Sequence, residues 1–202
     1  MITIVTVARS KSVHCSTLNS ILHINMYCLQ NNIQTSVHYI QDMAGLKRYL
    51  KNNERVIFFD YGSNINAECI PTMCSPLPKG YQVMVFPAVK EGVNWALFKK
   101  KTLEGSKEPT EQRGLTFDTK VDKQLGEFLW SVEKTEPQVW CLDVKPVDKI
   151  LKGTAIPMDS TMFNVMKLGG VKICACTAAR CTQTFIHKCV ANILETSGIT
   201  VK

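Results

Sequence analysis

The sequence predicts a single α/β domain over residues 1–202, in which a mainly parallel, mixed sheet is flanked by helices. Two observations predict this class. Strand-like and helix-like segments alternate through residues 1–60, the order that favours a parallel sheet with right-handed crossovers. Hydrophobic residues make up 45% of the chain and charged residues 20%, which is typical of a globular domain with its own core.

Three segments of residues 1–60 predict strands because they are rich in β-branched and aromatic residues: Ile2–Ala8, Thr35–Ile40 and Arg55–Asp60. Helices are predicted between them, since apolar residues recur there at helical spacing after a capping side chain. Ser16 is the expected cap of the first helix and Asp42 of the second. The apolar positions are Leu18, Ile21, Leu22 and Leu29, then Met43, Leu46, Tyr49 and Leu50.

The remaining chain continues this alternation less regularly. Further strands are predicted at Gln82–Phe86, Val139–Asp143 and Val171–Cys176. Further helices are predicted at Val93–Phe98, after a cap at Asp159 or Ser160, and over a closing amphipathic segment with Phe185, Cys189, Val190, Ile193 and Leu194. Residues 103–124 are polar without a sustained period. We therefore expect an irregular loop or lid there, with a domain boundary as the alternative.

The chain carries a net charge of +7. Lys99–Lys101 is its densest basic cluster, and no aromatic residues interleave with it, so a nucleic-acid partner is not expected. The basic excess is either a solvated face or a site for an anionic small ligand such as a nucleotide diphosphate. No apolar run is long enough to span a membrane, and no basic segment precedes the first apolar run. These two features predict a cytoplasmic protein without a membrane span.

Nine cysteines are present, and the odd number argues against a fully paired disulfide framework. In a reducing compartment they are expected to be small buried residues. The alternative is a zinc site, for which the candidate ligands are Cys174, Cys176, Cys181, His187 and Cys189. Cys174 and Cys176 lie in a predicted strand, where they share one face and fit a core role equally well.

Ligands of open α/β sheets bind outside the carboxyl ends of the strands. This rule selects Ala8–Ser12, Asp60–Asn64, Pro87–Gly92 and Asp143–Lys145 as the candidate rim of a site. Three common fingerprints are missing from the sequence: the P-loop, the glycine-rich dinucleotide turn and the serine-hydrolase elbow. The corresponding ATPase, dehydrogenase and hydrolase classes are therefore not expected.

Three segments stand out, namely Thr6–Arg9, Val56–Gly62, and Pro157–Phe163 with Gly169–Ile173. Together they resemble segments of glycosyltransferases of the GT-A type, whose fold is Rossmann-like. Thr6–Arg9 ends the first strand where that family receives the nucleotide. Val56–Gly62 is similar to the apolar strand that leads into its Asp-x-Asp motif, and Pro157–Phe163 with Gly169–Ile173 is similar to its later acidic motif, helix and strand. Small divergent members occur in large DNA viruses, so a viral protein in the host cytoplasm or virion is one expectation.

The resemblance implies a metal-assisted transfer of sugar from a nucleotide-sugar donor to a hydroxyl of a glycan or protein acceptor. Asp159 or Glu91 would accept the proton of the hydroxyl. Asp60 and His187 would hold Mn²⁺ or Mg²⁺. The residues expected to bind the nucleotide-sugar are Thr6, Ala8, Arg9, Lys11, Asp60 and Gly62.

The sequence departs from the family at the metal motif, because Gly62 stands where the second aspartate is expected. A metal-independent transferase is therefore one alternative. The other is a catalytically inactive relative that acts as a binding or virion structural protein. The oligomeric state is left open by the sequence.

Overall fold

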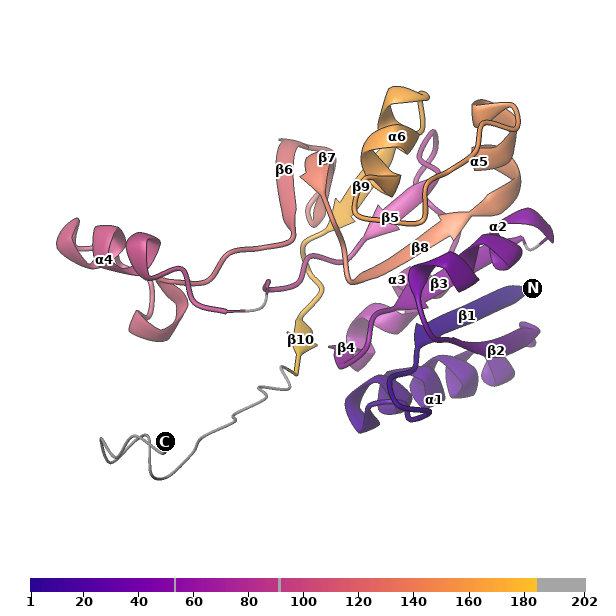
Figure 1. Ribbon diagram of the computed structural model, residues 1–202, viewed down its shortest axis with the longest axis horizontal. Coiled ribbons are helices and arrows are strands. Elements are labelled where there is room, and N and C mark those ends of the chain that lie inside the picture. Colours follow the sequence, from indigo (N-terminus) through magenta and orange to yellow (C-terminus); the bar gives the residue numbers. More distant parts are fainter. Residues whose placement is uncertain (53, 91, 185–202) are drawn as a thin grey trace, which may run out of the picture.

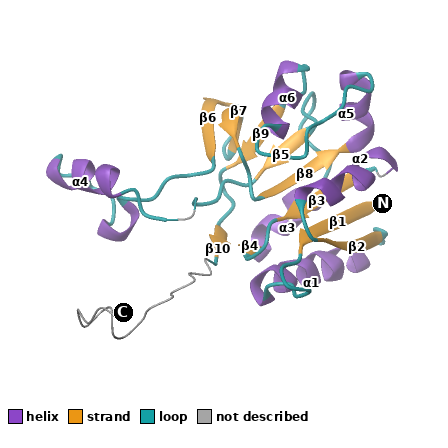
Figure 2. Cartoon of the chain, in the orientation of Figure 1, coloured by secondary structure: helices purple, strands orange, loops and turns teal. Residues whose placement is uncertain are grey.

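A computed structural model describes residues 1–52, 54–90 and 92–184 of the chain (Figure 2). The strands are β1 (Ile2–Val7), β2 (Thr35–Ile40), β3 (Arg55–Phe59), β4 (Ser63–Ile65), β5 (Val83–Val85), β6 (Thr119–Gln124), β7 (Leu129–Thr135), β8 (Val139–Asp143), β9 (Ile173–Cys176) and β10 (Cys181–Gln183). The α-helices are α1 (Cys15–Gln30), α2 (Tyr49–Asn52), α3 (Ile70–Cys74), α4 (Trp95–Leu103), α5 (Val144–Leu151) and α6 (Met162–Leu168). Short 3₁₀ turns are η1 (Met43–Arg48), η2 (Ala67–Cys69) and η3 (Thr110–Gln112).

Eight of these strands form one mixed sheet in the order β2-β1-β3-β8-β5-β9-β7-β6, and β4 pairs with β10 beside it (Figure 1). The strands β2, β1 and β3 are parallel, and β5 is parallel to β9. β8 lies antiparallel between β3 and β5, and β7 is antiparallel to β9 and β6. The predicted α/β class, with a mainly parallel, mixed sheet flanked by helices, is confirmed.

The direction of β8 corrects one part of the predicted rim. β1, β3 and β5 end at one edge of the sheet, and β8 begins at that edge because it is antiparallel to β3 and β5. Asp143 consequently lies at the opposite edge, where it pairs with Arg55 at the start of β3. The predicted rim at Asp143–Lys145 is therefore wrong, whereas Ala8–Ser12, Asp60–Asn64 and the chain after β5 share one edge.

The first helix also differs from its prediction. α1 begins at Cys15, and its cap is His14, whose Nδ1 accepts a hydrogen bond from the Ser16 N–H at 3.2 Å. Ser16 is thus inside the helix. The face that contacts the sheet consists of Thr17, Ser20, Ile21, Ile24 and Cys28. Leu18, Leu22 and Leu29, which were expected in the core, are exposed. By contrast, Asp42 is a cap as predicted, accepting from the Gly45 N–H at 3.1 Å, although a 3₁₀ turn precedes α2 there.

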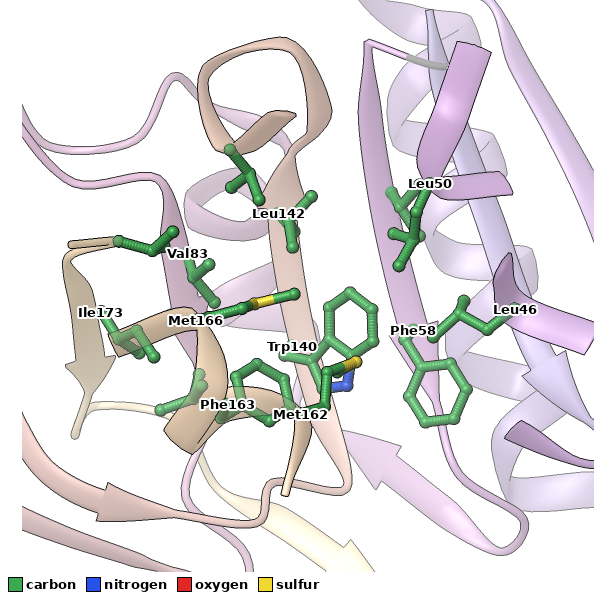
Figure 3. Packing of buried hydrophobic residues seen from close by; sticks show 14 of the residues in the cluster. Leu46, Leu50, Phe58, Val83, Trp140, Leu142, Met162, Phe163, Met166 and Ile173 are labelled. Atoms are coloured by element: carbon green, nitrogen blue, oxygen red, sulfur yellow. The ribbon is translucent and has the colours of Figure 1, made fainter. Parts of the chain in front are cut away.

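The core lies on both faces of the sheet. One face is covered by α1 and α3, and the other by η1, α2, α5 and α6. On this second face the Trp140 ring stacks on Phe58 at a centroid distance of 5.1 Å and meets the edge of Phe163 at 5.6 Å, with Met162 and Met166 alongside (Figure 3). Trp140 is fully buried at the centre of the sheet. It therefore joins β3, β8 and α6 in one cluster.

The polar stretch at residues 103–124 is only partly irregular. The helix predicted at Val93–Phe98 is present as α4, but it runs on to Leu103, the first residue of the polar stretch. At the other end of the stretch, β6 begins at Thr119 and pairs with β7. Between them the chain extends away from the sheet with α4 (Figure 1). Neither β7 nor α5 was predicted. Within the described ranges, no helix has the length and apolar character needed to cross a membrane.

Candidate functional site

Two neighbouring grooves follow the ends of β1 and β2. The first, which we call the Arg9 groove, has a volume of about 700 Å³ and is lined by Ala8, Arg9, Ser10, Lys11, Val13, Tyr39, Ile40 and Gln41. The second, the Lys47 groove, measures about 810 Å³ and shares Tyr39, Ile40 and Gln41 with the first; Lys47, Arg48 and Lys51 also line it. The two grooves together bring five cationic side chains to one side of this edge. Such a surface attracts phosphate groups.

A tight turn presents the cations of the Arg9 groove. Arg9 and Ser12 exchange two backbone hydrogen bonds of 3.0 Å, and between them Ser10 and Lys11 have φ values of 51° and 61°. This is a two-residue turn in which both central residues are left-handed, a conformation that favours Asn and Gly. A non-glycine residue costs roughly 1–2 kcal/mol there. Strain of this kind concentrates at functional sites.

The strain in this turn predicts that relieving it raises the free energy of unfolding and lowers the affinity for anions. The double variant Ser10→Asn, Lys11→Gly places the preferred residues in the turn, so we expect its free energy of unfolding to rise by about 1 kcal/mol. Because the variant also removes one cation, its affinity for anions should fall. Urea unfolding gives the first quantity and titration with inorganic pyrophosphate the second. Equal or lower stability of the variant would contradict the proposed strain.

A third cavity, the Asp60 pocket, lies between the end of β3, the chain that precedes β8, and α6. Its volume is about 360 Å³, and its lining residues are Met43, Phe58, Asp60, Lys90, Asp118, Glu136, Pro137, Gln138, Asp159, Ser160, Met162 and Phe163. Phe58, Met162 and Phe163 provide apolar walls (Figure 3), whereas four carboxylates face a single lysine, Lys90. That lysine lies 3.6 Å from Glu136. The pocket is therefore acidic, in contrast to the two grooves.

Asp60 is the carboxylate of the pocket that the charge of Arg9 reaches, although the pocket and the Arg9 groove share no lining residue. The Arg9 guanidinium lies 5.0 Å from the centre of the Tyr61 ring, next to Asp60 in the chain. Burial raises the pKa of the Asp60 carboxyl, while the Tyr61 N–H at 2.7 Å and the charge of Arg9 act in the opposite direction. The Asp60 carboxylate is consequently a more basic group than an exposed aspartate.

Asp159 lines the same pocket but has the opposite electrostatic character. Its Oδ1 accepts hydrogen bonds from the Thr161 hydroxyl at 2.5 Å and the Thr161 N–H at 2.7 Å. These bonds lower the pKa of Asp159 and hold the chain that enters α6. The predicted cap at Asp159 or Ser160 is wrong, because the N-cap residue of α6 is Thr161 and Asp159 instead forms a local turn just before the helix.

Asp118 is a member of the pocket that the sequence analysis missed. It is buried, and its carboxylate accepts hydrogen bonds from the Ala88 N–H, the Gln138 N–H and the Thr119 hydroxyl. Burial raises its pKa against these bonds. Asp118 thus ties the chain after β5 to the chain before β8. Its only signal in the sequence was a lone acid directly before the β-branched start of β6.

The structure places the other predicted site residues as follows. Ala8, Arg9 and Lys11 lie together in the Arg9 groove. Thr6 is buried in β1, and its hydroxyl has no hydrogen-bond partner among the described residues, so it does not reach either groove. Gly62 has φ 79°, and a Cβ there would lie 2.8 Å from the Thr184 carbonyl oxygen. Glu91 and His187 lie outside the described residues.

The geometry of Gly62 explains the missing second aspartate. A side chain at this position would be strained by the left-handed φ and would collide with backbone that pairs with Gly62, because the Thr184 N–H donates to the Gly62 carbonyl at 3.0 Å. The backbone of this turn therefore requires glycine, and Asp60 remains as a single carboxylate.

The described donors do not form a metal site. No three His, Cys, Asp or Glu side chains in the described part of the chain are grouped so that they could hold a metal ion. Asp118 is engaged by N–H and hydroxyl donors, and Asp159 by Thr161. Mn²⁺ or Mg²⁺ would therefore have Asp60 as its one uncommitted carboxylate ligand among the described residues of this pocket.

The cysteines of the zinc alternative have core environments where they are described. Cys174 and Cys176 are fully buried in β9, and burial raises the pKa of Cys174 to about 12 and also raises that of Cys176. Cys181 is partly buried and packs against the same cluster. Cys189, like His187, lies outside the described residues.

No protein-family model matches the sequence, and a search of curated proteins finds no match. Among solved structures, the chain is similar to A197 from STIV with a TM-score of 0.50 and 14% identity over 92% of this chain and 87% of that one. It is also similar to HddC from Yersinia pseudotuberculosis, with a TM-score of 0.45 and 10% identity over 91% and 93% of the two chains. For 4-diphosphocytidyl-2C-methyl-D-erythritolsynthase from Anaerococcus prevotii, the TM-score is 0.39 and the identity 11% over 87% and 89%. At 14% identity, the similarity to A197 shows a shared fold.

Proposed function

We propose that the protein is a glycosyltransferase that binds a nucleotide-sugar across the boundary between the Arg9 groove and the Asp60 pocket. The observation that carries the proposal is the contact of Arg9, from the basic groove, with the ring of Tyr61, the neighbour in sequence of Asp60 in the acidic pocket. A nucleotide-sugar has the same division, because a diphosphate is anionic and the attached sugar is neutral and partly apolar. The bond between them would lie beside Asp60.

The phosphates are assigned to Arg9 and Lys11. Both side chains line the Arg9 groove, and neither forms an ion pair with an acidic side chain among the described residues. Their charge would stabilise the diphosphate as it leaves. The sugar is assigned to the Asp60 pocket, where Phe58, Met162 and Phe163 can contact its apolar face. The exposed carboxylate of Asp159, which also lines this pocket, can accept hydrogen bonds from the sugar hydroxyl groups.

Asp60 is proposed as the group that accepts the proton of the attacking hydroxyl. A general base works best when its pKa lies near the working pH. Burial moves the pKa of Asp60 in this direction, whereas the Thr161 hydrogen bonds move that of Asp159 away from it. The initial candidates for this role were Asp159 and Glu91. A carboxylate at Asp60 instead lies at the boundary where the bond would break.

Binding of nucleotides tests the proposal. A nucleoside diphosphate at about a hundred times its dissociation constant should stabilise the fold by about 2.7 kcal/mol and raise the midpoint of thermal unfolding by several degrees. We expect Arg9→Ala to abolish this shift. Arg180→Ala, which removes an exposed arginine outside the grooves, should retain it. Parallel measurements with and without Mn²⁺ test the predicted metal.

Asp60→Asn separates binding from catalysis. This variant keeps the size of the side chain, so we expect the diphosphate to bind while sugar transfer, measured by release of nucleoside diphosphate, falls by at least a hundredfold. Absence of a thermal shift with every nucleotide tested would overturn the proposal.

The alternative is a catalytically inactive relative that acts as a binding or virion structural protein. This alternative is favoured by the loss of the second aspartate of the Asp-x-Asp motif. The backbone at Gly62 does not accept a side chain without strain, so the turn cannot carry a second metal-binding carboxylate at that position. It predicts a normal fold with no thermal shift in the same nucleotide series. A viral origin and a location in host cytoplasm or virion remain predictions from the resemblance.

A further inference from the structure

The segment from residue 12 to residue 41 contains no aspartate, glutamate, lysine or arginine, although such residues make up 20% of the chain. It comprises α1, β2 and the turns that flank them. A surface helix and an edge strand are the elements in which charged residues are normally most frequent. The absence of charge over 30 residues therefore needs an explanation outside the monomer.

An apolar stripe runs along the outer face of α1. Leu18, Leu22, Met26 and Leu29 are between 39% and 77% exposed, and their spacing places them in one row on the helix. The inner face of the same helix includes the polar Thr17 and Ser20. The helix thus directs its leucines to the solvent and small polar residues to the sheet. An exposed apolar row of this length is typical of an interaction surface.

The strand beside this helix has an open edge. β2 ends the sheet and pairs with β1 alone among the described strands. The N–H of Ile2 donates to the carbonyl oxygen of Gln34, and the N–H of Ala8 donates to the carbonyl oxygen of Ile40. The even-numbered residues of this stretch therefore direct their backbone N–H and C=O groups toward β1. In a parallel pair the alternate residues then direct their N–H and C=O groups outward. These residues are Thr35, Val37 and Tyr39. β2 also lacks the proline and lysine that normally protect an edge.

The stripe and the open edge lie on the same flank of the molecule. The Thr35 hydroxyl donates to the Asn25 side chain at 2.9 Å, which places Asn25 on the side of α1 that faces β2. Leu22 is three residues before Asn25 and Leu29 is four residues after it, so both lie on the same side of the helix as Asn25. Met26 is the next residue after Asn25. Figure 1 shows α1 running alongside β1 and β2 at this end of the sheet.

We propose that two copies of this chain associate through this flank, with β2 pairing antiparallel to the partner subunit's β2 and the two α1 stripes packing against each other. Antiparallel pairing across a two-fold axis continues the sheet and keeps both α1 helices on the same face. With Val37 on the axis, the outward groups of Thr35 meet those of the partner subunit's Tyr39. The stripe and the strand edge contain no acidic or basic residue, so they are self-complementary, and the cations of the two grooves border the seam only at its Tyr39 end.

The hydrogen bond between Thr35 and Asn25 sets the register of the helices. α1 connects two parallel strands and so runs antiparallel to them. Val37 is two strand residues beyond Thr35, about 6.6 Å. This distance corresponds to roughly four helix residues before Asn25, so the two-fold axis passes at the level of Ile21, and Leu22 is the exposed residue next to it. Leu22 should therefore meet the partner subunit's Leu22, whereas Leu29 lies about 12 Å from the axis.

The expected dimer is of moderate affinity. The contact is limited to one helix of 16 residues, about 24 Å long, and one strand of six residues. Such a contact is small beside a standard stable interface, which buries roughly 800 Å² per partner. We therefore expect dissociation in the micromolar range, visible as a mass that rises with concentration.

Light scattering after gel filtration tests the association. The mass of the wild-type protein should approach twice 22.7 kDa at high micromolar concentration. Leu22→Lys places a charge at the axis and Val37→Pro removes an outward N–H, so each should weaken dimerisation at least tenfold. Leu168→Lys is the matched control, since Leu168 is 90% exposed on α6, away from this flank, and should leave the mass unchanged.

Cross-linking tests the register. In a Cys15→Ser background, Leu22→Cys should form a disulfide between subunits under mild oxidation with copper phenanthroline, and Leu29→Cys should not. A wild-type mass that stays monomeric up to millimolar concentration would overturn the proposal. A dimer that persists in both Leu22→Lys and Val37→Pro would also overturn it. These readouts are taken without nucleotide, because Tyr39 belongs both to the proposed seam and to the Arg9 groove, so their outcome is separable from that of the nucleotide series.

Discussion

Replacement of Trp140 by alanine is expected to destabilise the protein by about 3–5 kcal/mol, the range measured for large aromatic residues removed from close-packed cores. Trp140 is completely buried, stacks on Phe58 at 5.1 Å and contacts the edge of Phe163 at 5.6 Å. Its loss would leave a cavity between the sheet and α6 that rigid strands cannot close. The free energy of unfolding in urea, followed by far-ultraviolet circular dichroism, measures the effect.

Two further variants separate the causes. Trp95 is 70% exposed, so Trp95→Ala should change stability by less than about 0.5 kcal/mol. The indole N–H of Trp140 has no hydrogen-bond partner in the part of the chain that the structure describes, so Trp140→Phe removes volume without breaking a hydrogen bond. Its cost should be well below that of alanine. A loss under 1 kcal/mol for Trp140→Ala would show that this cluster is not the centre of the core.

Arg55→Ala should destabilise the protein by about 3 kcal/mol, because it leaves a partly buried carboxylate and two carbonyl groups without their donor. The Arg55 Nε donates to Asp143 at 2.7 Å, and its Nη1 donates to the carbonyl oxygens of Cys74 and Ser75. The guanidinium thereby joins the start of β3, the end of β8 and the end of α3. Since the Asp143 side chain is a quarter exposed, water screens part of the loss, and we place the effect at the lower end of the usual range.

The matched control is an ion pair on the surface. Lys120 and Glu133 approach to 2.8 Å with more than half of each side chain exposed, so Lys120→Ala should cost less than about 1 kcal/mol. The double variant Arg55→Met, Asp143→Leu should recover stability relative to Arg55→Ala, because neither charge is then unpaired. If Arg55→Ala were no worse than Lys120→Ala, the bridge between β3, β8 and α3 would carry no energetic weight.

Several elements were predictable because their local signals agree with their final environment. β1, β3 and β8 are rich in β-branched and aromatic residues and are buried on both faces of the sheet. Gly169–Gly170 ends α6 as expected, with Gly170 in a left-handed conformation at φ 94°. In these cases neighbouring residues and the tertiary structure favour the same conformation.

Other elements were not predictable because side chains distant in the sequence decide them. Val139–Asp143 has the composition of a strand, but only pairing with both β3 and β5 determines that it runs antiparallel. That choice moved Asp143 from the expected rim to Arg55. Likewise, the leucines of α1 have helical spacing, but the sheet receives the opposite face of the helix.

For the candidate site, the sequence by itself determined that Arg9, Lys11 and Asp60 would follow parallel strands and meet at one edge of the sheet, because carboxyl ends of parallel neighbours coincide. Asp118 entered the pocket through tertiary structure alone, since its three hydrogen-bond donors belong to β6 and to the chain segments after β5 and before β8. The physical reason is the range of the forces: turn and strand propensities act over a few residues, whereas burial and pairing of polar groups depend on which segments the fold brings together.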